Sequence, residues 1–109
     1  MVAVQRFDVV LLNLDPTIGS EMKKTRPAVI VSPDSMNRSR LKTVIIAPLT
    51  STVREKHPTR VSTVFQEKKG QAALDQIRAV DRTRLIHKLG SLDDKTALRI
   101  RELLVTMFE

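Results

Sequence analysis

Residues Pro27–Ser32, with the sequence PAVIVS, place four aliphatic residues between a proline and a serine. A short, wholly apolar run is typical of a buried strand, and Pro27 stands at its first position, where a missing N–H group is tolerated. Similar runs lie on either side. Phe7–Leu14 (FDVVLLNL) ends at an Asp-Pro turn signal, and Thr43–Leu49 (TVIIAPL) contains Pro48, which suggests a sheet edge or a bulge.

Further strands follow toward the C-terminus. Apolar and polar residues alternate along Thr59–Phe65, which is typical of a half-buried strand. Gln71–Val80 is long enough for one or two more strands. Gly70 and Gly90 are expected to separate the strands. Strands that recur about every fifteen residues without intervening helices predict a mainly β fold. We therefore expect a small antiparallel barrel or curled sheet rather than a parallel α/β fold.

The spacing of the apolar residues changes near the C-terminus. Ser91 begins the sequence SLDD, a helix-capping signature that places Asp93 and Asp94 in a first helical turn. Apolar residues then recur at spacings of three and four, which predicts a C-terminal helix packed on the sheet. The expected packed face is Ala97, Ile100, Leu104, Met107 and Phe108.

Length and composition predict one cytoplasmic domain over residues 1–109. The chain has no cysteine, which excludes disulfides, cysteine-ligated metals and a thiol nucleophile. Its N-terminus lacks the features of a signal peptide. No apolar stretch approaches the roughly 20 residues of a membrane span.

The net charge of +7 favours polyanionic partners. Residues 1–92 hold 16 of the 19 basic and 8 of the 12 acidic residues, so the excess belongs to the body of the domain. In the alternative interpretation, the positive charge serves only to keep the protein soluble. With three Phe and no Tyr or Trp, an aromatic platform for stacked bases is excluded, and RNA would be held by charge, backbone groups and small pockets.

Several chemistries are disfavoured by the residue pattern. The three glycines are too scattered for a phosphate-binding loop, and the acidic residues and histidines form no metal-ligand pattern, so we expect neither cofactor nor metal. His57 and His87 suggest an acid and base pair for RNA cleavage. His57 lies in a polar stretch and His87 among apolar neighbours, and we expect a structural or solvated role for each.

A candidate site combines Glu21, Arg26 and the hydroxyl run Thr50-Ser51-Thr52. An arginine at the start of a strand is held more firmly than one in a loop, and its planar guanidinium suits two phosphate oxygens. If the second and third strands pair, Arg26 and Thr50 converge on one phosphate. The residue types leave a second interpretation open, in which Arg26 pairs with a surface acid and Thr50 caps a turn.

Four blocks of the sequence together resemble the MazF/PemK toxins of bacterial toxin–antitoxin modules. They are GSEMKKTRPAVIVS, IIAPLTS, DQIRAVDRTRL and LGSLDD, and they span the chain from about Arg6 to the C-terminal helix. The resemblance implies an SH3-like barrel with a C-terminal helix, a homodimer, and endoribonuclease activity on short sequences in single-stranded mRNA. It also implies an antitoxin with an acidic C-terminal tail that covers the RNA site, and binding of the toxin–antitoxin complex to its operator DNA.

The resemblance carries over to individual residues. The family's arginine corresponds to Arg26, its threonine to Thr50, and its glutamate to Glu21 in the loop over bound RNA. The implied reaction is attack by the ribose 2′-hydroxyl, giving a 2′,3′-cyclic phosphate and a 5′-hydroxyl, with Arg26 on the phosphorane and Thr50 bonded to the same phosphate. Arginine is an unfavourable base because it stays protonated, which leaves Glu21 or water. Residues assigned to RNA contact are Gly19, Ser20, Lys23, Lys24, Ser51, Arg54, Gln76, Arg78 and Arg84.

The chain departs from the family pattern at Ala73. Some members carry an arginine two places before the aspartate of the Asp-Gln motif and are thought to use the pair as acid and base. Here Ala73 precedes Leu74-Asp75, so we assign Asp75 a structural or RNA-contact role.

Two other functions remain as alternatives. One is a CcdB-like gyrase poison, which would use the end of its last helix, but this chain ends VTMFE without a tryptophan. The other is a non-catalytic nucleic-acid-binding barrel, because fold alone does not determine function.

Overall fold

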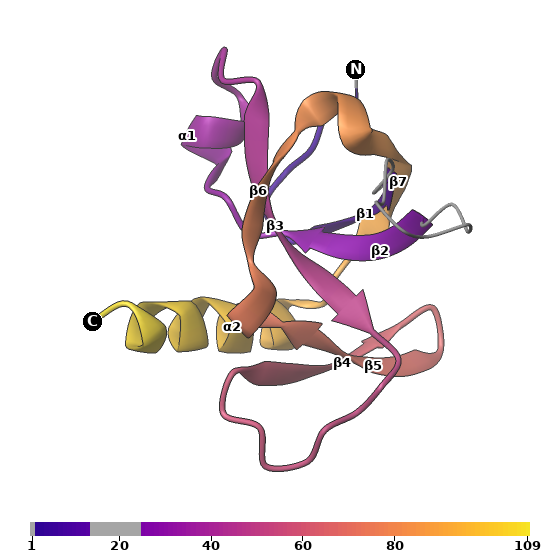
Figure 1. The fold of residues 1–109 in the computed structure, drawn as a ribbon, viewed down its shortest axis with the longest axis vertical. Coiled ribbons are helices and arrows are strands. Elements are labelled where there is room, and N and C mark those ends of the chain that lie inside the picture. The colour runs from indigo at the N-terminus through magenta and orange to yellow at the C-terminus, as the bar shows by residue number, and fades with distance from the viewer. Residues whose placement is uncertain (1, 14–24) are drawn as a thin grey trace, which may run out of the picture.

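Seven strands form one curled antiparallel sheet in the computed structural model, which describes residues 2–13 and 25–109. The chain order, drawn in Figure 1, is β1 (Asp8–Asn13), β2 (Thr25–Ile30), α1 (Asp34–Asn37), β3 (Thr43–Thr50), β4 (Arg60–Phe65), β5 (Lys68–Ala73), β6 (Arg78–Asp81), β7 (Leu85–Ser91) and α2 (Asp94–Met107). Two short 3₁₀ turns, Leu74–Gln76 and Arg82–Arg84, precede β6 and β7. The mainly β fold with a C-terminal helix is thereby confirmed.

Strand β3 lies inside the sheet and changes partner along one edge. Its other edge pairs with β2, while Thr43–Ile46 pair with β6 and Leu49–Thr50 pair with β5. The prediction that Pro48 marks a sheet edge or bulge was wrong, because Pro48 pairs with Ala28 inside the sheet. Pro48 lies between the segments that pair with β6 and with β5, where the loss of one N–H donor interrupts neither ladder.

The sheet has a hydrophobic core on each face, because successive side chains of a strand point to opposite faces and both sets are apolar here. On one face, Val10 and Leu12 of β1 pack with Ile30 and Ile46. On the other, Val9 of β1 joins a second core that contains Ile100 of α2 and residues of the β4–β5 hairpin. Figure 1 shows α2 next to the β4–β5 hairpin and well separated from α1. The helix therefore covers one face of the sheet, as expected.

The ends of α2 differ from the prediction. Its N-cap is Asp93, whose carboxylate accepts from the N–H of Thr96, whereas Ser91 is the last residue of β7. Capping by Asp93 satisfies a free amide of the first turn without a serine. Phe108 is 70% exposed and lies past the end of the helix, so it does not belong to the packed face. In the described part of the chain, no helix has the length and apolar character needed to cross a bilayer.

The glycines do not end the strands as expected. Gly70 lies within β5 and Gly90 within β7, and each is a point of close approach. A Cβ on Gly70 would stand 2.5 Å from the carbonyl oxygen of Thr50. The turn between β4 and β5 is instead made by Gln66 and Glu67, both with positive φ. Sequence analysis also missed β7 and α1.

Candidate active site

Arg26 and Thr50 face each other across neighbouring strands. The β2–β3 register pairs Ala28 with Pro48 and Val29 with Ala47. The same register, continued two residues from Ala28, places Arg26 opposite Thr50. Both residues line a cavity of about 190 Å³, which we call the arginine cavity. The strand pairing on which the predicted convergence depends is therefore present, and the binding of one phosphate by both residues stays a prediction.

The Thr50 hydroxyl is oriented by the chain that follows it. Its oxygen accepts a hydrogen bond from the N–H of Thr52 at 3.1 Å, which forms a small turn at the end of β3. A hydroxyl has one proton to donate as well as two lone pairs, so this turn leaves the Thr50 proton available. The two interpretations of Thr50, turn cap and phosphate donor, are compatible.

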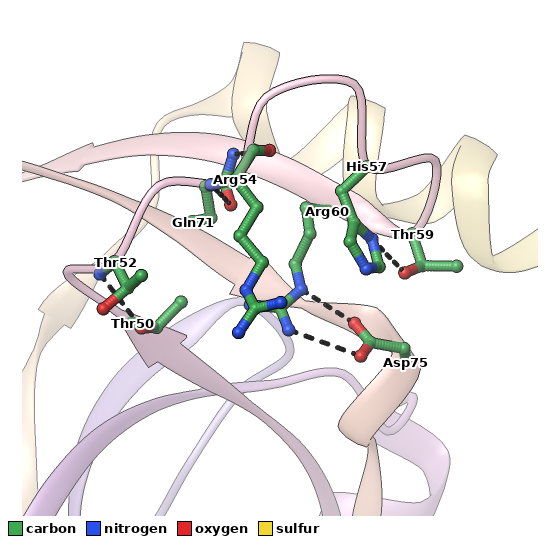
Figure 2. A network of polar contacts seen from close by, with 8 residues as sticks. All are labelled: Thr50, Thr52, Arg54, His57, Thr59, Arg60, Gln71 and Asp75. Carbon is green, nitrogen blue, oxygen red and sulfur yellow. Dashed lines mark hydrogen bonds and ion pairs between the residues drawn. The ribbon is translucent and has the colours of Figure 1, made fainter.

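Arg54 is held at the cavity by its backbone. The buried Gln71 side chain accepts from the N–H of Arg54 at 3.0 Å and donates to its carbonyl oxygen at 3.1 Å. These two bonds tie the loop after β3 to β5. Figure 2 shows the Arg54 side chain extending from this anchor toward Arg60, and both arginines line the arginine cavity.

Arg60 is the residue of this site that sequence analysis missed. Its Nε donates to Oδ1 of Asp75 at 2.9 Å and its Nη2 to Oδ2 at 3.4 Å (Figure 2). The Arg60 side chain is only 8% exposed, so its charge depends on this partner. In the β4–β5 register Arg60 lies directly opposite Ala73. Asp75 therefore takes its arginine partner from β4, the strand that pairs with β5.

The Asp75 carboxylate is held in its ionised form. Desolvation acts to raise its pKa, but hydrogen bonds from its own backbone, Thr59 and Arg60, with the Arg60 charge, together lower the pKa below its ordinary value. A carboxyl group with a lowered pKa is a poor proton donor near neutral pH. This favours a role for Asp75 in positioning Arg60.

The arginine cavity is strongly electropositive. Three guanidinium groups, those of Arg26, Arg54 and Arg60, line it, and Asp75 neutralises one of them. Within residues 2–13 and 25–109, Arg26 forms no ion pair, so the alternative in which it pairs with a surface acid receives no support there. Like charges gathered in one hollow favour an anion between them.

The histidines lie apart from this chemistry. The Nδ1 atom of His57 shares a hydrogen bond with the Thr59 hydroxyl at 2.9 Å, and His87 is exposed on β7, opposite Leu11. Neither histidine is among the described residues that line the arginine cavity. The described residues also contain no cluster of three His, Asp or Glu side chains able to hold a metal ion.

The predicted RNA contacts are distributed over several surfaces. Gln76 lines both the arginine cavity and an adjoining cavity of about 370 Å³, which Arg26 and Arg78 also line. Ser51 instead lines another pocket at the end of β3, which shares Leu49 and Thr50 with the arginine cavity. Arg84 lies in the turn before β7 and donates to the carbonyl oxygen of Asn13 at 3.3 Å, away from both cavities. The assignments of Gly19, Ser20, Glu21, Lys23 and Lys24 lie outside the described residues.

The departure from the family pattern at Ala73 was the feature of the sequence from which Arg60 could have been predicted. An aspartate that lacks the nearby arginine of some family members needs another basic partner, and the strand that pairs with β5 is where to look for it. Taken together, the fold and the site define a small basic β-sheet protein in which arginine and threonine side chains line one hollow.

Comparison with known proteins identifies the family. The family model of the PemK-like, MazF-like toxins of type II toxin–antitoxin systems matches residues 5–108. Endoribonuclease EndoA of Bacillus subtilis (strain 168) is 34% identical over 106 residues, which cover 93% of this chain and 90% of that protein. Endoribonuclease MazF of Staphylococcus saprophyticus is 39% identical over 97 residues, which cover 84% and 80%.

A solved structure agrees with these relatives. A mycobacterial endoribonuclease in complex with its cognate antitoxin has a TM-score of 0.79 and 26% identity, with 97% of this chain and 95% of that chain covered. The chain belongs to the PemK-like, MazF-like toxins of type II toxin–antitoxin systems. The resemblance inferred from the four sequence blocks is thus confirmed.

Proposed function

We propose that this endoribonuclease toxin cleaves single-stranded RNA, with Arg26 and Thr50 holding the scissile phosphate in the arginine cavity. The observation that carries the proposal is their opposed position at the ends of β2 and β3, beside Arg54 and Arg60. A guanidinium and a hydroxyl on paired strands present fixed donors to adjacent phosphate oxygens. Two curated relatives named endoribonucleases support the activity.

The chemistry uses the substrate's own nucleophile. The ribose 2′-oxygen attacks the neighbouring phosphorus, and the bond to the 5′-oxygen breaks, leaving a 2′,3′-cyclic phosphate and a 5′-hydroxyl. The 2′-hydroxyl loses a proton to a base and the departing 5′-oxygen gains one. Arg26 stabilises the negative charge that grows on the phosphorane oxygens, and the Thr50 hydroxyl donates to the same phosphate. The reaction as proposed needs no metal.

The proton acceptor is Glu21 or water. Arg26 keeps its proton across the working pH range, which makes it an electrostatic catalyst rather than a base. Asp75 is ionised and bonded to Arg60, and we assign it to holding that arginine in place. Arg54, Gln76 and Arg78 bind the RNA on either side of the scissile phosphate.

The toxin acts in the cytoplasm on mRNA, as a homodimer, and an antitoxin with an acidic tail neutralises it by covering the arginine cavity. The net charge of +7 and the arginines of the cavity support an acidic partner. The mycobacterial endoribonuclease solved with its cognate antitoxin supports the same kind of partner here. Binding of the toxin–antitoxin complex to its own operator DNA belongs to the same proposal.

Cleavage of a long single-stranded RNA in excess EDTA tests the proposal. Wild type is compared with Arg26→Ala, Thr50→Ala and the control Arg40→Ala, which removes an exposed arginine that precedes β3. We expect cutting by wild type and the control, and a loss of at least about 100-fold in Arg26→Ala. Intact RNA with wild type across varied sequences would remove the nuclease proposal. Undiminished cutting by Arg26→Ala would remove only the role of that residue.

The two alternatives make different predictions in the same assay. A gyrase poison and a non-catalytic barrel both leave RNA intact. A poison also has a protein target, which is tested by DNA supercoiling in the presence of gyrase. The endoribonuclease relatives favour cleavage over both.

A further inference from the structure

A second pocket adjoins the arginine cavity at the end of β3. It has a volume of about 290 Å³ and lies between the β4–β5 hairpin and strands β1, β2, β3 and β7. Its floor is apolar and includes Leu11, Leu49, Phe65 and Leu89. We call it the hairpin pocket.

The rim of the hairpin pocket is polar and basic. Ser51 and Gln66 supply a hydroxyl and an amide, and Lys68 and Lys69 supply two positive charges. No acidic residue is among its described lining residues. An apolar floor with hydrogen-bonding groups and cations at the rim suits a nucleobase and its flanking phosphate.

The hairpin pocket and the arginine cavity meet at one residue pair. Leu49 and Thr50 line both. A nucleotide whose phosphate bonds to Thr50 therefore has its own or its neighbour's base within reach of the hairpin pocket. The carbonyl oxygen of Thr50 also lies against Gly70, which leaves no space for a side chain there.

The turn that forms the rim is strained. Gln66 and Glu67 have φ values of 50° and 66° and connect β4 to β5 directly. A two-residue turn with both residues in the left-handed region normally takes Asn-Gly, because other residues pay a steric cost there. Gln66 nevertheless occupies this position, lines the pocket, and donates from Nε2 to the carbonyl oxygen of Leu89 at 3.3 Å. Strain kept at a cavity is a sign of function.

We propose that the hairpin pocket binds the base of a nucleotide next to the phosphate held by Arg26 and Thr50, and that Gln66 reads this base. The inference rests on the proposed endoribonuclease function and extends it to sequence preference. The Gln66 amide hydrogen-bonds the edge of the base, the apolar floor contacts its faces, and Lys68 and Lys69 bind the flanking phosphate. An apolar anchor of an acidic peptide is the competing occupant. The continuity with Thr50 favours RNA, because one strand then fills both cavities.

Two substitutions in the same turn separate base reading from stability. Gln66→Asn shortens the side chain that lines the pocket and places in the turn a residue that tolerates positive φ. Glu67→Gly relaxes the neighbouring position, which is not among the described lining residues. Both variants are expected to fold at least as stably as wild type, which thermal unfolding verifies.

Mapping of all cut sites in a long RNA gives the readout. Wild type and Glu67→Gly are expected to share one base preference at a position flanking the cut. In Gln66→Asn the preference at that position should fall by at least about fivefold, the discrimination carried by a good base contact. An unchanged preference in Gln66→Asn overturns the inference. Failure of wild type to cut any RNA overturns the proposed function instead.

A binding measurement on wild type covers the case in which a variant misfolds. A short RNA with a 2′-deoxy sugar at the cut step binds without reacting, and NMR follows the methyl groups of Leu11, Leu49 and Leu89. Shifts of these methyls on addition of the RNA support the inference. RNA that shifts the Thr50 amide and leaves all three methyls in place overturns it, and shifts produced only by an acidic peptide assign the pocket to that partner.

Discussion

Arg60 and Asp75 form a bidentate pair although they lie on different elements, with Nε to Oδ1 at 2.9 Å and Nη2 to Oδ2 at 3.4 Å. The pair exists because the β4–β5 register sets Arg60 opposite Ala73, two residues before Asp75. Arg60 lines the arginine cavity together with Arg26 and Thr50, so the pair holds one of the arginines of that cavity in place. An interaction with a largely buried arginine has a measurable effect on stability.

Asp75→Asn should lower the free energy of unfolding at neutral pH by about 1 kcal/mol, the usual scale for such a pair. The pKa of Asp75 is lowered in the folded protein, so its stabilising effect is present above its ordinary pKa and is lost as the pH falls through the lower folded value. The difference between wild type and variant should therefore shrink between about pH 5 and pH 2. Urea unfolding at several pH values measures it.

A difference that stays constant on acidification would show that Asp75 does not stabilise the fold through its charge. The carboxylates of Asp34, Asp81 and Asp93 also have lowered pKa values. They titrate in both proteins, so the comparison cancels their contribution. Arg60→Met is the matched variant. It should remove the part of the pH dependence that comes from Arg60 and leave the part that comes from the hydrogen bonds of the Asp75 backbone and Thr59, while keeping the packing of the side-chain stem.

Thr50→Val should lower kcat by at least about tenfold with little effect on stability. Valine keeps the shape of threonine and its preference for strands but has no hydroxyl to donate to the phosphate. Thr50→Ser retains the hydroxyl and should retain most of the activity. RNA cleavage at saturating substrate measures both variants. Equal rates for Thr50→Val and wild type would exclude the hydroxyl from the reaction.

The parts of the site that could be predicted from the sequence are those set by neighbouring strands. Arg26 and Thr50 each stand at the end of an apolar run, and the pairing of β2 with β3 brings the two ends together. Arg60 could not be placed in the same way, because its partner depends on the β4–β5 register and on the turn that follows β5. Local patterns show which residues form a strand, but not which side chain of another strand lies opposite.

The same limit explains the errors at the end of the chain. The sequence SLDD offers two possible caps, and the pairing of Ser91 with Asp8 of β1 keeps Ser91 in the strand and leaves Asp93 to begin the helix. Phe108 has the spacing of a packed residue, but the helix ends at Met107, before it. A tertiary contact, the pairing of Ser91 with Asp8, therefore decided where the helix begins.

Gly70→Ala should reduce activity and stability together. The added methyl group would stand 2.5 Å from the carbonyl oxygen of Thr50, which must move to accommodate it. We expect a loss of about 1–3 kcal/mol in unfolding free energy, the usual cost of overpacking, and a lower kcat because Thr50 is displaced. Gly90→Ala is the control, since its methyl meets only the Phe65 ring at 3.0 and 3.1 Å. Normal cleavage by Gly70→Ala would show that the site tolerates movement of Thr50.

Arg54→Gln should weaken RNA binding and reduce its dependence on salt. The Arg54 backbone is held by Gln71, so the substitution changes the charge of the cavity while the anchor of the loop remains. Removing one cation that binds a phosphate of single-stranded RNA reduces the slope of log K against log salt by about 0.7. Titration of a non-cleavable RNA from low to high salt measures the slope. Arg40→Gln makes the same change in net charge outside the arginine cavity and should leave the slope close to that of wild type. Equal slopes for Arg54→Gln and Arg40→Gln would mean that RNA is drawn by the overall charge of the protein rather than held in the cavity.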